Sequence, residues 1–97
     1  MAIKVIVELQ AKPGKRAELQ RVLEGIVAKH GPSDGSFLGS TRYEVLDQPD
    51  ILVEIAEWES AEARAAHMRD SAATGVYAPL LELLAAPFRA TVIKPLF

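Results

Sequence analysis

Ninety-seven residues carrying a net charge of −2 and no cysteine limit what this chain can be. A chain of this length buries roughly 60–65% of its unfolded surface, so we expect one domain spanning residues 1–97 with a thin core. The absence of cysteine excludes disulfides, thiolate nucleophiles, iron–sulfur clusters and cysteine zinc sites. Acidic and basic residues are interleaved, which indicates neither a nucleic-acid partner nor an anionic membrane surface.

The distribution of apolar residues bears on location and assembly. No apolar run approaches the roughly 18 residues of a membrane span, and the N-terminal MAIKVIVEL alternates instead of forming a signal peptide. These features favour a cytoplasmic protein that does not bind a membrane. The apolar fraction is 49%, which is more than a small monomer easily buries and indicates self-association.

The first third of the chain predicts a strand followed by a helix. Residues 3–10 alternate between apolar and polar side chains apart from Ile6, which predicts a strand with one apolar face and one mixed face. A Lys-Pro-Gly turn ends this strand. Apolar residues then recur at helical spacing from residue 15 to residue 30, and Gly31-Pro32 is expected to stop the helix.

The middle of the chain predicts a hairpin. Residues 37–46 and 50–58 read as two strands, and the Asp-Gln-Pro-Asp segment between them favours a short antiparallel connection. The side chains of the second strand alternate, so that one face carries Leu52, Glu54, Ala56 and Trp58.

The last third predicts helices and a closing strand. Ser60 is a candidate N-cap, and the alanine-rich residues 61–69 favour a helix. We expect a break near residues 69–71 and then a second helix with Pro79 in its first turn. Residues 88–94 alternate again as a final strand.

This order of elements predicts an α+β, ferredoxin-like (split βαβ) fold, a four-stranded antiparallel sheet with helices on one face. The other face is expected to mix Ile6 with Glu8, Arg42 and Glu44, and Arg42 is expected to pair with one of these glutamates across strands or chains. A partly apolar open face favours a homodimer in which two sheets meet or close into a shared α/β barrel.

The motifs of metal and nucleotide sites are missing from the sequence. The two histidines, His30 and His67, fall in different predicted helices without an HxH or HExxH pattern. Neither GxGxxG nor GxxxxGK[ST] occurs. We therefore expect no metal and no cofactor. His30, in the last turn of its helix, is interpreted as a partner of the helix dipole.

Four residues are candidates for a pocket, and each also has a plainer interpretation. Trp58 and His67 are either two walls of a pocket, or a core aromatic residue and a half-buried helix residue. Tyr77 either adds a second aromatic wall with a hydroxyl or packs in the core. Glu54 shares a strand face with Trp58, and contributes either to the pocket or to ion pairs between subunits.

Three segments carry a resemblance to a known family: AKPGKRAELQRVLEGI, TRYEVLDQPD and EIAEWESAEARAAHM. Together they resemble the antibiotic biosynthesis monooxygenase family of dimeric α/β-barrel proteins. The resemblance implies a shared barrel, with Trp58 and His67 lining a pocket. Some members of the family oxidise polycyclic phenols or anthrones with O₂ and neither metal nor flavin, whereas others isomerise a small phosphorylated diketone, degrade haem or have no known activity.

One departure from the family is visible in the sequence. This chain contains no asparagine, on which well-studied monooxygenase and haem-degrading members rely. Where those members carry a pocket amide, this chain has Glu54, Thr41 or Ser40 as replacements, or none.

Two functions follow as hypotheses. The first is a small cofactor-independent monooxygenase-like enzyme that acts on a phenolic, quinol or enolisable small molecule. An isomerase acting on such a molecule is the alternative within this class. His67 would act as the catalytic base, since histidine is suited to take a proton near neutral pH. The second is a non-catalytic or vestigial homodimer that binds a small aromatic or carbonyl molecule. The expected substrate-binding residues are Trp58, Tyr77, Leu80, Leu84 and Glu54.

Overall fold

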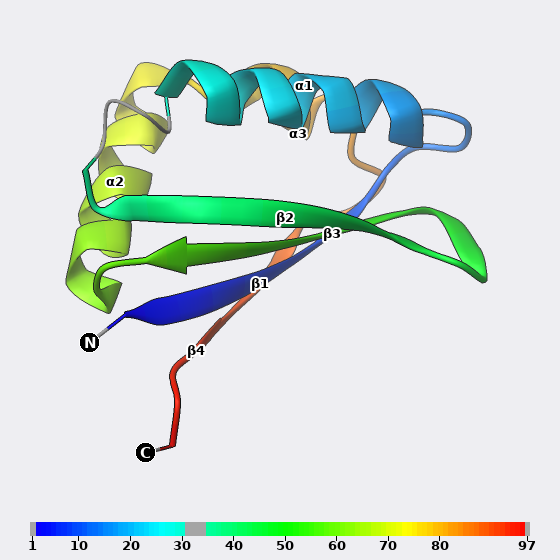
Figure 1. The fold of residues 1–97 in the computed structure, drawn as a ribbon. Coiled ribbons are helices and arrows are strands. Elements are labelled where there is room, and N and C mark those ends of the chain that lie inside the picture. The colour runs from blue at the N-terminus through cyan, green and yellow to red at the C-terminus, as the bar shows by residue number, and fades with distance from the viewer. Residues whose placement is uncertain (1, 31–34, 97) are drawn as a thin grey trace.

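The computed structural model describes residues 2–30 and 35–96 and has the predicted ferredoxin-like architecture (Figure 1). Four antiparallel strands form one sheet in the order β2-β3-β1-β4, and the helices lie over one face of it. None of the helices in these residues is both long and apolar enough to cross a membrane. The elements in chain order are β1 (Ile3–Gln10), α1 (Arg16–His30), β2 (Phe37–Val45), β3 (Gln48–Trp58), α2 (Ala61–Thr74), α3 (Ala78–Leu81) and β4 (Arg89–Ile93).

The two central strands bear out the predicted difference between the faces of the sheet. In β1, Ile3, Val5 and Leu9 are buried towards the helices, whereas the alternate residues Lys4 and Glu8 are exposed. The register of β1 against β3 pairs each buried residue of β1 with a buried residue of β3. The helix-facing side of the sheet therefore carries the core.

The prediction for Arg42 and Glu44 was wrong. Their partners in the β2–β3 register are Glu54 and Leu52, which face the helices, so both residues lie on the helix side and not on the open face. Arg42 contacts Glu24 of α1, with Nε 3.3 Å from Oε2. Since β2 is an edge strand, charged side chains here reach partners on α1 and remain partly in water, which removes the cost of burying them.

The hairpin between β2 and β3 is tighter than predicted. β3 begins at Gln48, which pairs with Val45, so only Leu46 and Asp47 form the turn. Pro49 is accommodated because the β2 register shifts beside it and the pairing of β3 with β1 begins later, at Ile51.

The helix α2 is longer than predicted. Ser60 is its N-cap, as expected, and its hydroxyl accepts a hydrogen bond from the Ala63 N–H at 3.1 Å. The expected break near residues 69–71 was wrong: the helix continues to Thr74 and ends where Gly75 adopts the left-handed conformation, with φ 71°. Pro79 lies in the first turn of α3, as predicted. The predicted helix stop at Gly31-Pro32 and the side chain of His30 lie outside the described residues.

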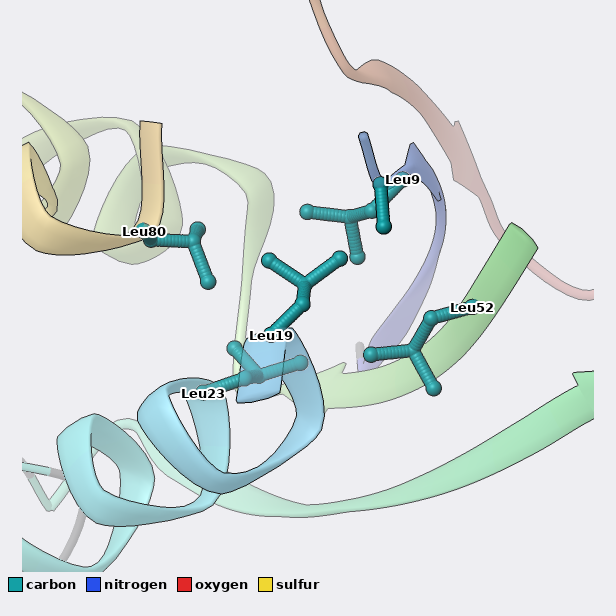
Figure 2. Packing of buried hydrophobic residues seen from close by; sticks show 6 residues of the cluster. Leu9, Leu19, Leu23, Leu52 and Leu80 are labelled. Atoms are coloured by element: carbon teal, nitrogen blue, oxygen red, sulfur yellow. The ribbon is translucent and has the colours of Figure 1, made fainter. Parts of the chain in front are cut away.

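The buried hydrophobic side chains form two clusters. The larger is the leucine cluster, shown in Figure 2, in which leucines from β1, α1, β3 and α3 converge. The smaller, the tryptophan cluster, consists of Ile3, Val5, Ala56 and Trp58. Val7 packs against both clusters. Each fully buried leucine stabilises the fold by about 1.5–3 kcal/mol. The leucine cluster contains Leu9, Ala11, Leu19, Leu23, Leu52 and Leu80.

Candidate functional site

A cavity of about 90 Å³ lies between the sheet and the helices and is lined by members of both clusters. Most of its walls are aliphatic or aromatic, and its polar groups come from β3, α2 and the segment before α3. A mainly apolar cavity with a few polar groups is the usual form of a small-molecule site. Its walls are formed by Val5, Val7, Leu9, Leu23, Ile26, Val27, Phe37, Glu54, Ala56, Trp58, Arg64, His67, Met68, Tyr77, Leu80 and Phe88.

His67 projects from α2 at this cavity and is half-buried. Its Nε2 lies 3.3 Å from the Ser71 hydroxyl, one helical turn along α2, and 3.4 Å from the Tyr77 hydroxyl. Both distances exceed the usual range for such hydrogen bonds, so both bonds are weak. A ligand hydroxyl at a shorter distance could replace either of them.

Trp58 forms the neighbouring wall. The centroid of its ring lies 4.9 Å from that of His67, and the planes are inclined by 51°. On β2, Phe37 meets Trp58 edge to face at 5.1 Å. The indole is buried, and Ser60 starts α2 just after it, so the short connection from strand to helix places Trp58 and His67 together.

Tyr77 lies between α2 and α3, where the chain turns after Gly75. Its hydroxyl lies near His67 Nε2 and 4.0 Å from the Met68 sulfur. Burial raises the pKa of the Tyr77 phenol, and the neighbouring Ser71 hydroxyl only partly opposes this effect. The phenol is therefore protonated at neutral pH and available as a hydrogen-bond donor.

Glu54, in the middle of β3, brings a carboxyl group to the cavity from the sheet. The residue is only 9% exposed, and its Oε2 has no hydrogen-bond partner among the described residues. The nearest cationic group is Arg42 Nη1, at 3.9 Å, which is too far for a hydrogen bond. Burial raises the pKa of Glu54, while Ser40 and Arg42 act in the opposite direction. Of the two interpretations offered by the sequence, the cavity is the one this position fits.

The structure brings together five of the six residues expected at the site: Glu54, Trp58, His67, Tyr77 and Leu80 line the cavity. Leu84 does not line it. It packs against the leucine cluster and pairs with Ala11 in an isolated bridge, because α3 ends at Leu81 and the chain then leaves the helix.

The residues at or behind the cavity wall that were not anticipated include Phe37, Arg64, Met68 and Ser71. Arg64 and Ser71 are one turn from His67 in either direction, so helical spacing would have indicated both. Phe37 follows from the strand register, which places it opposite Trp58. Among the described residues, no group of three histidine, aspartate or glutamate side chains is placed to hold a metal ion.

A split βαβ sheet whose helices enclose an apolar cavity defines a class of small α+β proteins. The model of the Antibiotic biosynthesis monooxygenase family matches residues 2–76, and the chain belongs to this family. A search of curated proteins found no match.

Solved structures of several bacterial proteins share the fold. A protein from Mycobacterium tuberculosis is 24% identical and superposes with a TM-score of 0.81 over 100% of this chain and 97% of its own. SnoaB from Streptomyces nogalater, a cofactor-independent oxygenase solved as a variant with asparagine replaced by alanine, is 16% identical, with a TM-score of 0.81 over 99% of this chain and 94% of its own. A Bordetella bronchiseptica protein assigned to the same family by name gives a TM-score of 0.85 at 15% identity, over 99% of this chain and 98% of its own. At these identities the matches establish the fold.

Proposed function

We propose that this protein is a small cofactor-independent monooxygenase-like enzyme that acts on a phenolic, quinol or enolisable molecule held in the cavity. One observation carries the proposal: His67 lines a mainly apolar cavity beside the Trp58 ring, with its Nε2 within 3.4 Å of the Ser71 and Tyr77 hydroxyls. A base in such a position can reach a substrate proton once the ligand is bound.

In the proposed reaction His67 removes a proton from a substrate hydroxyl or from a carbon next to a carbonyl. The resulting anion is electron-rich and gives one electron to O₂, which forms a substrate radical and superoxide. These two combine into a peroxide anion, and the protonated His67 returns its proton to give a hydroperoxide. Loss of water from the hydroperoxide then leaves a new carbonyl. For a CH₂ centre the sum is CH₂ + O₂ → C=O + H₂O, with O₂ as the oxidant and the substrate carbon oxidised.

The walls of the cavity support this chemistry. Trp58 and Leu80 are buried apolar surfaces against which a planar ring can pack. By excluding water they protect the radical pair and strengthen the polar contacts that remain. The protonated Tyr77 hydroxyl donates a hydrogen bond and is positioned to stabilise negative charge that develops on substrate oxygen.

We also propose that two copies form a homodimer through the open face of the sheet. Ile6 and Ile55 are paired across β1 and β3 on that face, and Thr41 and Thr91 continue the row on both sides. Sedimentation at micromolar concentration tests this assembly. A dimer that Ile55→Glu converts to a 10.5 kDa monomer is the expected result, and a parent chain that sediments as a monomer contradicts it.

A second function, non-catalytic binding of a small aromatic or carbonyl ligand, is favoured by the absence of asparagine from the chain. Oxygen uptake with a panel of hydroquinones and anthrones in metal-free buffer distinguishes the two. The enzyme consumes O₂ in proportion to protein and substrate, above the rate of autoxidation. Tight binding without O₂ uptake or product supports the binder and contradicts the enzyme.

A further inference from the structure

One polar atom at the cavity lacks a partner. Glu54 Oε2 is buried and accepts no hydrogen bond from the described residues, although the great majority of buried polar atoms in proteins are paired. A buried carboxylate oxygen without a donor destabilises the fold. The position therefore has an unused capacity to accept a hydrogen bond from whatever occupies the cavity.

The charged neighbour of Glu54 is held by other groups. Arg42 donates to the Ser40 hydroxyl at 2.9 Å and to Glu24 at 3.3 Å, while its distance of 3.9 Å from Glu54 Oε2 gives charge compensation without a hydrogen bond. Arg42 thus offsets part of the effect of burial on the Glu54 carboxyl group and leaves Oε2 without a hydrogen bond.

The polar groups of the cavity therefore come from two layers. His67 and Tyr77 belong to the helical layer, and Glu54 belongs to the sheet. The walls that connect them are apolar, as with Val7 and Leu80. A ligand that satisfies both layers needs a hydrocarbon body with an oxygen function at two positions.

We propose that the Glu54 carboxylate accepts a hydrogen bond from a substrate hydroxyl, so that the cavity selects planar molecules with one oxygen function for His67 and a second, hydroxyl function for Glu54. A buried carboxyl oxygen that lacks a donor discriminates against ligands that leave it unpaired. The inference rests on the proposed function because it takes the cavity as the substrate site, and it adds the substrate class and a second binding residue.

Calorimetric titration with matched naphthalene probes tests it. The probes are 1-naphthol and the 1,5-, 1,6- and 1,7-dihydroxynaphthalenes, each of which adds one hydroxyl to the second ring of 1-naphthol. At least one diol is expected to bind the parent protein about tenfold more tightly than 1-naphthol, since a hydrogen bond to a charged group is worth about a factor of ten. In Glu54→Leu this advantage falls below about twofold, while 1-naphthol still binds.

The controls separate a lost contact from a damaged fold. Glu82→Gln, at an exposed position outside the cavity, should keep the full preference. If Glu54→Leu does not fold, Glu54→Gln decides: its neutral amide oxygen is a weaker acceptor, so the diol advantage should fall several-fold. Failure of every diol to bind more tightly than 1-naphthol, or an advantage that survives in both Glu54 variants, overturns the inference.

The outcome is independent of catalysis because binding alone is measured. Oxygen uptake by a parent protein without a diol preference overturns only the role of Glu54. A Glu54-dependent preference in a protein that consumes no O₂ supports that role and contradicts only the oxygenase.

Discussion

The leucine cluster and the cavity lie on the same face of the sheet but differ in packing and polarity. In the leucine cluster, Leu9, Leu19 and Leu52 are almost completely buried and pack against one another. Beside the cavity, Glu54 and Tyr77 are largely withdrawn from water, and burial raises the pKa of both side chains. The leucine cluster thus stabilises the fold, and that stability allows polar groups and empty space to persist next to it.

The two helices explain the difference. The helix α1 carries Leu19 and Leu23 into the core, whereas α2 is rich in alanine and places Arg64, His67 and Met68 at the cavity. Alanine favours the helix but fills little volume. The composition of α2 therefore favours a stable helix, and the polar and sulfur-containing side chains of that helix line the cavity where α1 contributes leucines to the core.

The largest expected effect is on catalysis. His67→Ala should lower kcat for O₂ uptake by about 10²–10⁴-fold, the usual contribution of a general base, with a much smaller change in substrate binding. Arg69→Ala, at an exposed position on the same helix, is the control and should retain parental kcat. Equal turnover by His67→Ala and the parent would remove the histidine from the mechanism.

The next effect is on stability. Leu19→Ala should lower the free energy of unfolding by about 2–5 kcal/mol, because it opens a hole in a fully packed cluster. Urea denaturation measures the change. Leu81→Ala, at a position 50% exposed, should cost far less. Similar losses for the two variants would show that the leucine cluster is not the stabilising region.

A matched pair of substitutions compares the two regions directly. Ala11→Val adds volume to the leucine cluster and should destabilise the protein by about 1–3 kcal/mol. Ala56→Val adds the same volume at the cavity wall, where there is space, and should cost less than about 1 kcal/mol while weakening 1-naphthol binding. Equal destabilisation, measured by urea denaturation, would mean that the cavity side is as tightly packed as the leucine cluster.

The smallest effect is the pH dependence of stability. Because the pKa of Glu54 is raised from 4.5 by burial, the folded state binds its proton more tightly than the unfolded state. The stability of the parent relative to Glu54→Gln should therefore be highest below pH 4.5 and decline as the pH rises through the folded-state pKa. Urea denaturation of both proteins from acidic to neutral pH measures this difference, and an increase with pH would show that Arg42 outweighs burial.

Much of the fold could be predicted because it follows from local patterns. Alternation gave the strands, and the serine N-cap and Pro79 gave the starts of α2 and α3. The faces of Arg42 and Glu44 could not be obtained in this way. A polar residue on an edge strand suits either face, and the choice depends on α1, which supplies Glu24 and Arg16 as partners. The predicted end of α2 near residues 69–71 was too early. Residues 71–74 contain nothing that stops a helix, so α2 continues to Thr74.

The site was predictable where its residues are close in sequence. Trp58 and His67 are joined by one short turn, so their proximity follows from the strand and the N-cap. Leu84 was expected on the cavity wall, but α3 ends at Leu81 and Leu84 pairs with Ala11 instead. The length of α3 depends on this long-range pairing, which the local sequence does not indicate. The missing partner of Glu54 depends on distances between side chains of neighbouring strands, which sequence patterns do not contain.

Gly75 has a consequence for how such a protein can diversify. Its left-handed backbone, which other residues adopt only at a cost of about 1–2 kcal/mol, sets the angle at which the chain leaves α2 and delivers Tyr77. Insertions or substitutions between Gly75 and Tyr77 would change the position of the Tyr77 side chain at the cavity. The sheet that carries Glu54 and Trp58 would stay intact. The range of ligands that fit the cavity can thus change through the short segment after α2, while the sheet keeps its structure.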